Sequence, residues 1–150
     1  MKTSKQIIIF FICSLGGIVS ACANAEFERA KIDGHDIYLN INKCEYSIDG
    51  GDLKKLNLSE KCYFIRNNIT KDIAYSFEKD IRSNVILIVG ESVTNNPDFP
   101  LTKIRKDCGS QLQALILPKE GKPKLSKVIK ETITCAGIGV DKKEFWIISH

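Results

Sequence analysis

Apolar and polar residues alternate along much of the chain after residue 25, and a period of two is the pattern of half-buried β-strands. Ile37, Leu39 and Ile41 give the clearest case, because polar or amphipathic residues separate them. The turn residues Asp33-Gly34 precede this run. The predicted strands lie at 37–41, 62–66, 73–77, 85–89 and 111–117.

The run at 85–89 contains only branched apolar residues, which indicates a central strand that is covered on both faces. Gly90 is expected to end this strand. The apolar spacing of residues 125–135 fits one face of a helix, but their Val, Ile and Thr content favours a strand. We predict a strand for this segment. The apolar residues at 145–148 predict a terminal strand.

Residues 26–150 are expected to form a single disulfide-stapled globular domain, because they contain no internal repeat, low-complexity tract or Pro-rich linker. A chain of this length can bury about two thirds of its unfolded surface around one core. The predicted elements favour a mainly β fold, either a small antiparallel sheet or a sandwich. A single added helix would make the fold α+β.

The first 25 residues have the layout of a secretory signal peptide. Lys2 and Lys5 precede an apolar stretch at 7–19, and small residues follow it. The stretch is too short to span a bilayer, because a transmembrane helix needs about 20 apolar residues. Cleavage after the small-x-small sequence Ala23-Asn24-Ala25 would release a soluble periplasmic protein that begins at Glu26.

The end of this leader also carries a second processing signal. Val19-Ser20-Ala21-Cys22 resembles the lipobox of bacterial lipoproteins. The resemblance implies a signal peptide at 1–21 and lipidation of Cys22, which becomes the first mature residue. Because Ala23 rather than an Asp follows the cysteine, the sorting rule of that family implies anchoring to the outer membrane of a Gram-negative bacterium. Both processing routes stay open, and both predict an exported protein.

Four cysteines lie in the exported part, because Cys13 and Cys22 belong to the leader. An even number of cysteines in an oxidising compartment predicts disulfides. The four are Cys44, Cys62, Cys108 and Cys135. They allow three pairings, and we favour Cys44 with Cys62 and Cys108 with Cys135 because each pair closes a short loop. No C-x-x-C spacing occurs and only two histidines are present, so no metal site or other cofactor is expected.

Basic residues gather in the last third of the chain. Residues 26–100 hold 10 Lys or Arg against 13 Asp or Glu, whereas residues 101–150 hold 10 against 5. The exported part as a whole is close to neutral, so nucleic acid is not an expected partner. The densest basic run consists of Lys119, Lys122, Lys124, Lys127 and Lys130. This run is either a basic face for an acidic partner or a row of solvated lysines that protects an edge strand or covers a helix face.

Three groups of residues could carry chemistry, and each also has a structural explanation. Cys108 with His35 or His150 would form a thiolate and base pair, but a disulfide at Cys108 is favoured. Ser76-Phe77-Glu78-Lys79 matches the S-x-x-K pattern of serine β-lactamases and penicillin-binding proteins, although the sequence lacks the S-D-N and K-T-G elements of that family. Asp33-Gly34-His35-Asp36 could bind a cation, but hairpin turns are rich in Asp and Gly for backbone reasons.

These features favour a non-catalytic binding protein of the cell envelope, such as an inhibitor or immunity protein that acts on a secreted toxin or hydrolase. Its partner would be another protein, held by residues 94–101 or by the basic run at 119–130. Two alternatives stay open. One is a small envelope hydrolase or thiol enzyme that uses the candidates above. The other is a structural component of an envelope assembly, which would contact the membrane through the lipid anchor or the basic face.

Overall fold

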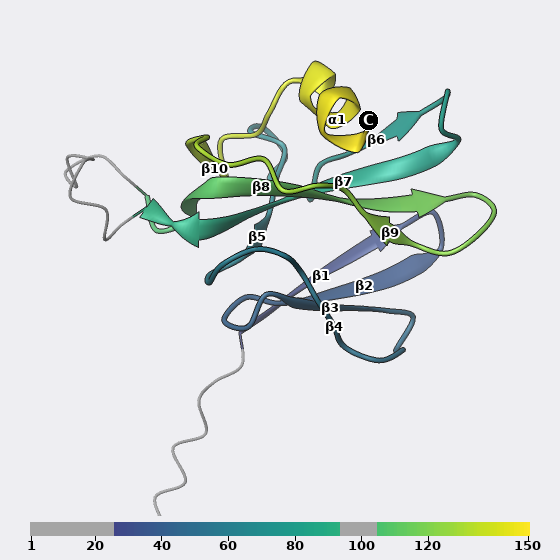
Figure 1. Ribbon diagram of the computed structural model, residues 1–150, viewed down its shortest axis with the longest axis horizontal. Helices are drawn as coiled ribbons and strands as arrows, with labels where there is room; N and C mark the ends of the chain where they lie inside the picture. Colours follow the sequence, from purple (N-terminus) through teal and green to yellow (C-terminus); the bar gives the residue numbers. More distant parts are fainter. Residues whose placement is uncertain (1–25, 94–104) are drawn as a thin grey trace, which may run out of the picture.

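Two antiparallel sheets, one helix and two disulfides make up the computed structural model, which describes residues 26–93 and 105–150 (Figure 1). This mainly β architecture with a single helix confirms the predicted fold class. The predicted leader with Cys22 and the predicted partner loop at 94–101 lie outside the described residues. Among the described residues, no helix has the length and apolar character needed to cross a membrane.

The first sheet contains four strands that pair in chain order. They are β1 (Phe27–Ile32), β2 (His35–Asn40), β3 (Glu45–Ile48) and β4 (Lys54–Lys55). The β1–β2 hairpin turns at Asp33 and Gly34, whose φ angles of 51° and 87° are left-handed. Such a two-residue turn matches the twist of the strands that it joins. The predicted strand at 37–41 corresponds to β2, whereas β1, β3 and β4 were not predicted.

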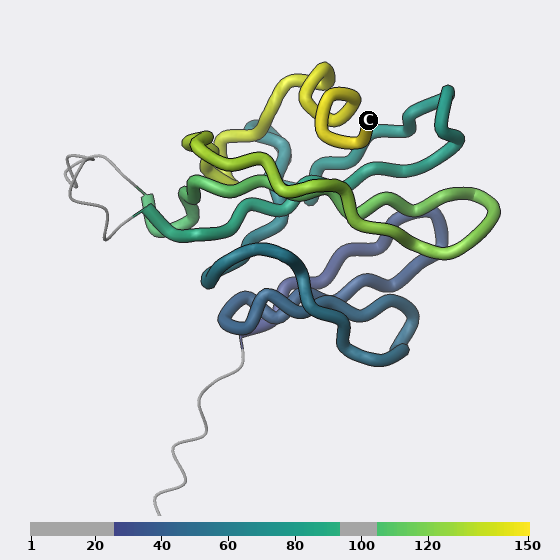
Figure 2. Tube along the Cα trace, viewed as in Figure 1, coloured from purple at the N-terminus to yellow at the C-terminus, as the bar shows by residue number. Residues whose placement is uncertain are grey.

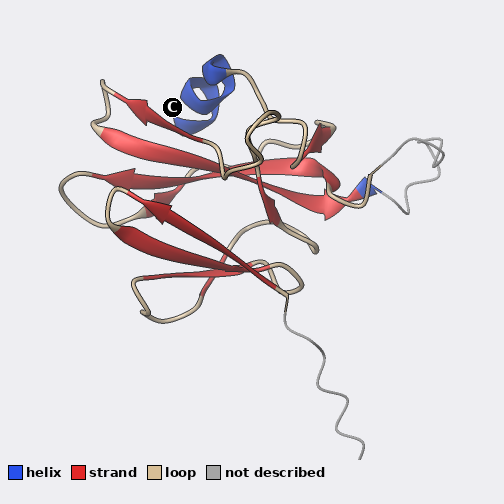
Figure 3. Ribbon diagram, turned by 180° about the vertical axis from the view of Figure 1, so that it is seen from behind, coloured by secondary structure: helices blue, strands red, loops and turns tan. Residues whose placement is uncertain are grey.

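The second sheet is built around the long antiparallel pair of β7 and β8. Its strands are β5 (Tyr63–Phe64), β6 (Tyr75–Glu78), β7 (Ser83–Ser92), β8 (Cys108–Pro118), β9 (Lys124–Leu125) and β10 (Thr134–Cys135). On one side of the central pair, β5 and β6 both bond to β7, and on the other side β9 and β10 bond to β8. The tube in Figure 2 and the reverse view in Figure 3 follow the chain from the first sheet into the second.

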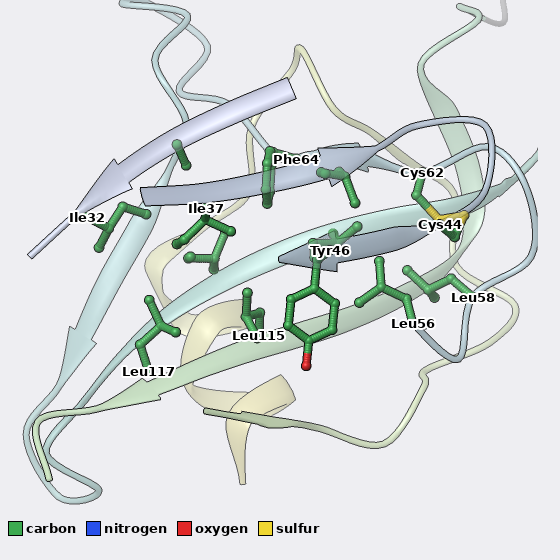
Figure 4. Close-up of a cluster of buried hydrophobic side chains, with 14 residues drawn as sticks. Ile32, Ile37, Cys44, Tyr46, Leu56, Leu58, Cys62, Phe64, Leu115 and Leu117 are labelled. Carbon is green, nitrogen blue, oxygen red and sulfur yellow. A yellow bond between two sulfur atoms is a disulfide. The ribbon is translucent and has the colours of Figure 1, made fainter. Parts of the chain in front are cut away.

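Side chains at alternate positions of β7 and β8 enter two separate apolar clusters. Ile86 and Leu115 pack against Ile37 and Leu39 of the first sheet, in the cluster drawn in Figure 4. Burying one such side chain stabilises the fold by about 1.5–3 kcal/mol. The two sheets therefore form a sandwich around this shared core.

The opposite face of the β7–β8 pair is covered by the helix α1 (Lys142–Ser149). Val85 and Leu87 of β7 belong to the same buried cluster as Phe145 and Ile148 of α1. The central strand is thus covered on both faces, as its continuous apolar run predicts.

The helix replaces the terminal strand that was predicted at 145–148, and that prediction is wrong. Phe145 and Ile148 are buried, whereas Trp146 and Ile147 between them are about half exposed. Positions three apart share a helix face but lie on opposite faces of a strand. The composition of four consecutive apolar residues fits either a helix or a strand. Because the second sheet covers only one side of this segment, the helix, which brings Phe145 and Ile148 to the same side, is the favourable conformation.

The prediction that Gly90 ends its strand is also wrong, because β7 continues to Ser92. The glycine serves close packing instead. A Cβ atom at Gly109 of β8 would lie 2.1 Å from the backbone oxygen of Gly90, and a Cβ at Gly90 would lie 2.8 Å from the Cβ of Leu58. Both glycines therefore let backbone segments approach more closely than any side chain allows.

One amide side chain, that of Gln113, is completely buried in the sandwich core. Its Oε1 accepts a hydrogen bond from the backbone N–H of Asn57 at 3.0 Å, and its Nε2 donates to the carbonyl of Ser126 at 2.8 Å. On the same strand, Oε1 of Gln111 accepts from the N–H of Ser59 at 2.9 Å. These bonds compensate the cost of burying polar groups and fix two loops on β8.

Cys44 pairs with Cys62 and Cys108 pairs with Cys135, which confirms the predicted connectivity. The two bridges close sequence separations of 18 and 27 residues. Cys108 opens β8, and Gly90 beside Cys62 lies near the end of β7. Both disulfides therefore lie at the same end of the sandwich.

Replacing Cys44 and Cys62 together by alanine should lower the free energy of unfolding by roughly 3 kcal/mol, because the unfolded chain regains the entropy that loop closure removes. Urea denaturation at neutral pH measures this loss. The matching Cys108→Ala/Cys135→Ala protein opens a longer loop and should lose slightly more. An unchanged denaturation midpoint in either protein would contradict the expected contribution.

The variant Gly109→Ala should be less stable by about 1–3 kcal/mol, because its new methyl group overlaps a backbone oxygen that cannot move aside easily. Thermal and urea unfolding both report the change. Gly51→Ala is the milder comparison, since a Cβ there would meet only the Ile48 oxygen at 3.1 Å, a contact that a small shift relieves, and it should cost less stability than Gly109→Ala. If the two variants were equally stable, the backbones of β7 and β8 could not approach each other at Gly109 as closely as described.

Candidate functional site

The basic run predicted from the sequence lies along one edge of the second sheet. We call these residues the lysine edge: Lys119, Lys122, Lys124, Lys127 and Lys130. Lys119 and Lys122 belong to the hairpin between β8 and β9, Lys124 opens β9, and the other two follow it. Figure 1 shows this hairpin at the right-hand end of the sandwich.

The segment that carries the lysines follows β8 as an interrupted edge strand, and the predicted strand at 125–135 is only partly formed. Leu125 pairs with Leu115, Ile129 bridges to Leu112, and Thr134 pairs with Gly109. More residues lie between these pairs on the edge segment than on β8, so the segment bulges twice. Bulges bend and twist an edge away from further pairing.

Ser126 fixes the first of these bulges. Its Oγ accepts a hydrogen bond from the N–H of Ala114 at 2.9 Å and donates to the carbonyl of Lys127 at 2.8 Å. Its own N–H donates to the carbonyl of Ala114 at 3.0 Å. The backbone that positions Lys124 and Lys127 is therefore anchored on the central strand pair.

All five ammonium groups of the lysine edge are exposed, and none forms an ion pair with the rest of residues 26–93 and 105–150. Lys119 places its Nζ 5.0 Å from the ring centroid of Phe77 in β6, a cation–π contact. Of the two acidic residues in the same stretch, Glu120 lies 3.4 Å from Arg82, and Glu131 is exposed. The edge therefore keeps an excess of positive charge that is free to attract anions.

The lysine hairpin lies at the end of the sandwich opposite Glu26. The N–H of Ile41 donates to the carbonyl of Glu26, and the N–H of Cys62 donates to the carbonyl of Ile41, which places Glu26 at the disulfide end. Strand β7 has 10 residues, and at a rise of 3.2–3.4 Å each they span roughly 30 Å. If the protein were attached to a membrane through the residues before Glu26, the lysine hairpin would therefore lie at the end of the sandwich away from that attachment.

A groove lies between β6 and the start of α1, with a volume of about 810 Å³. Tyr75 and Phe77 of β6 line it, and Ile138 and Lys142 lie on the wall formed by α1 and the preceding loop. Tyr75 and Ile138 are more than half exposed. Ser76, which also lines the groove, is buried, and its hydroxyl has no hydrogen-bond partner within the described part of the chain.

The far end of α1 is held by the carboxylate of Asp80 in the β6–β7 turn. Nε1 of Trp146 donates to Oδ2 of Asp80 at 3.1 Å, and Nε2 of His150 lies 2.9 Å from the same oxygen. The rings of Trp146 and His150 stack with centroids 4.7 Å apart. The hydrogen bond from Trp146, with smaller contributions that include the charge of His150, lowers the pKa of Asp80.

The three candidates for chemistry are dispersed. Cys108 is in a disulfide, so the predicted alternative of a thiolate at this position is wrong. His35 lies on the first sheet, where its Nδ1 is 2.7 Å from Oδ2 of Asp49 and its hydrogen bond lowers the pKa of that carboxyl. Residues 26–93 and 105–150 contain no group of three or more His, Cys, Asp or Glu side chains that could hold a metal ion.

The S-x-x-K candidate does not form a site either. Ser76 lies in a strand, in which positions three apart point to opposite faces, and Lys79 is exposed. Ser76 is also only 7% accessible, so little of it is presented to solvent. The third candidate, Asp33-Gly34-His35-Asp36, has a structural role. Oδ2 of Asp33 accepts a hydrogen bond from Nδ2 of Asn84 at 3.1 Å, which links the hairpin turn to β7.

The groove and the Asp80 contact were not predicted from the sequence. Asp80 and Trp146 are 66 residues apart, and Tyr75 and Ile138 come from elements whose packing has no local sequence signal. Only the paired aromatic residues of β6 could have suggested that this strand carries an exposed surface.

Comparisons of the chain with protein-family models, with curated proteins and with solved structures find no match.

Changing Asp80→Asn should reduce the acid sensitivity of the protein. The pKa of Asp80 is lower in the folded state than in the unfolded chain, so its stabilisation is complete above an unfolded pKa of about 3.9 and is lost as the pH falls through the folded value. The wild type should therefore lose more stability than the variant between roughly pH 5 and pH 2. Thermal unfolding midpoints over this range provide the measurement.

The control for this experiment is Asp52→Asn, which changes an exposed carboxylate that has no partner among the described residues. It should follow the wild-type pH profile. Parallel profiles for the wild type and Asp80→Asn would show that the contact with Trp146 does not contribute to stability.

Proposed function

We propose that this protein is a non-catalytic binding protein of the cell envelope, comparable in role to an inhibitor or immunity protein, and that the lysine edge binds an acidic surface of another protein. The observation that carries the proposal is the row of exposed ammonium groups without ion-pair partners in the described part of the chain. Such a row raises the rate of encounter with an acidic partner and selects against basic ones.

Two features support the proposed location in the cell envelope. Two disulfides need an oxidising compartment to form and persist. The leader predicted at 1–25 supplies the route, either by release at Glu26 into the periplasm or by lipidation of Cys22 at the outer membrane. Together the disulfides and the predicted leader support export of the sandwich, which would be the functional part of the protein.

The position of the lysine hairpin favours a protein partner over a lipid surface. An anchor at Cys22 would reach the sandwich through Glu26. Lys119 and Lys122 lie at the opposite end of β7, roughly 30 Å away. These charges would then face away from the bilayer, where the anionic headgroups lie, and toward proteins in the surrounding compartment.

The charge-reversal variant Lys122→Glu/Lys124→Glu/Lys127→Glu tests this role. Exposed ion pairs contribute about 0.2–1 kcal/mol each, so the loss of three should weaken binding roughly tenfold. Tagged wild-type and variant proteins are compared for the proteins that they retain from envelope extracts, and the affinity for the retained partner is then measured at two salt concentrations. Wild-type binding should weaken as salt screens the charges.

The matched control is Lys31→Glu/Lys54→Glu/Lys106→Glu, which changes the net charge equally at exposed lysines outside the lysine edge. It should retain the partner as the wild type does. Equal loss in both triple variants would indicate a dependence on net charge alone and would overturn the proposal, as would the absence of any specifically retained protein.

A further inference from the structure

The start of α1 forms one wall of the groove beside β6. Asp141, the residue that caps this helix, makes no side-chain hydrogen bond to it. The N–H groups of Lys142 and Lys143 donate to no backbone carbonyl of the described residues. The first N–H groups of a helix carry a partial positive charge and attract anions. The helix therefore presents unused donors at the groove.

A second, independent feature of the groove is the buried hydroxyl of Ser76. Residues directly opposite each other in an antiparallel pair project to the same face, and Ser76 lies opposite Val85 of β7. Val85 belongs to the apolar cluster that includes Phe145 of α1, so the Ser76 side chain points to the helix side of the sheet, where it lines the groove. The residue is 7% accessible, and its Oγ has no hydrogen-bond partner within the described residues. A buried hydroxyl without a partner costs free energy, and a ligand in the groove would supply the missing hydrogen bond.

Charges of both signs line the groove. Lys142 supplies an ammonium group, whereas Asp141 and Glu144 supply carboxylates. None of these three forms an ion pair with a described residue. The remaining charged residue of the lining, Arg66, is paired with Glu28, with 2.5 Å between Nη2 and Oε1. A ligand of one sign would be attracted by one set of charges and repelled by the other. Charge complementarity therefore favours a ligand that carries one positive and one negative group.

The loops that border the groove are fixed to each other before any ligand binds. Nζ of Lys71 donates to the carbonyl of Asn68 at 2.5 Å and to the carbonyl of Gly137 at 3.2 Å. Gly139 has a φ angle of 84°, and a Cβ atom there would lie 3.1 Å from the backbone oxygen of Arg66. The volume of about 810 Å³ is within the range of small-ligand sites. A preformed site loses less conformational entropy on binding.

We infer that this groove binds a zwitterion with an α-ammonium and an α-carboxylate group, which is either a free amino acid or a short peptide. The carboxylate accepts hydrogen bonds from the start of α1 and from the Ser76 hydroxyl, and it pairs with Lys142. The ammonium group pairs with Asp141 and Glu144. The groove lies on the β7 side of the β7–β8 pair and the lysine edge lies on the β8 side, so this inference is independent of the proposed function.

The test is an NMR chemical-shift titration of the purified protein with two probes, alanine and trialanine. Both should shift amide signals of residues 74–77 and 138–145, and the tighter binder identifies the amino acid or the peptide as the ligand. Acetylating the amine of the tighter probe, or amidating its carboxylate, should each weaken binding roughly tenfold, because each change removes one charge-assisted contact.

Variants assign the two ends of the ligand. Lys142→Ala should bind the amidated and unmodified probes equally but still discriminate against the acetylated probe, and Glu144→Gln should show the reverse. Ser76→Ala should weaken binding without lowering the thermal unfolding midpoint, because the hydroxyl has no partner in the free protein. Lys130→Ala, which removes an exposed lysine of the lysine edge, is the matched control and should bind as the wild type does.

The inference is overturned if the blocked and unblocked probes bind equally, if neither probe shifts the amides beside the groove, or if Lys142→Ala and Lys130→Ala have the same effect. None of these measurements uses the partner retained from envelope extracts. Failure of the zwitterion site would therefore be distinguishable from failure of the lysine edge.

Discussion

The pairing of β7 with β8 is the constraint on which the other elements depend. This ladder runs from Ser83 opposite Pro118 to Ser92 opposite Gly109, and its side chains alternate between two apolar clusters. Each face needs a cover that excludes water. The first sheet covers one face and α1 covers the other. Strands β5, β6, β9 and β10 then complete the sheet by bonding to the two sides of this pair, so the groove and the lysine edge both take their positions from it.

Local alternation was sufficient to predict the long strands. Residues 85–89 were correctly predicted as a doubly covered strand, and the two cystine pairs followed from loop length. The errors have a common cause, since each concerns a residue whose role depends on distant segments. Residues 145–148 form a helix because only one of their faces meets the sheet, and Gly90 lies within β7 because another backbone crosses it there.

The same distinction between local and distant contacts decides which parts of the candidate site could be predicted from the sequence. Five lysines at close spacing are visible in the sequence, and their exposure follows from the cost of burying charge. The groove is not visible, because it combines β6 with a helix that begins more than 60 residues later. The buried amide of Gln113 is similar: its two partners, Asn57 and Ser126, lie on opposite sides of it in the sequence. Polar residues of this kind acquire their roles only when the sheets pack.

The placement of both disulfides at one end gives the sandwich an uneven resistance to opening. Covalent links tie the segments around Cys44 and Cys135 at the end nearest Glu26, whereas the hairpin that carries Lys119 and Lys122 is held by hydrogen bonds and packing alone. Local fluctuations cost less free energy where fewer constraints act. The hairpin end of the sandwich should therefore open at a lower cost in free energy than the end nearest Glu26, where the two disulfides keep the segments together during such openings.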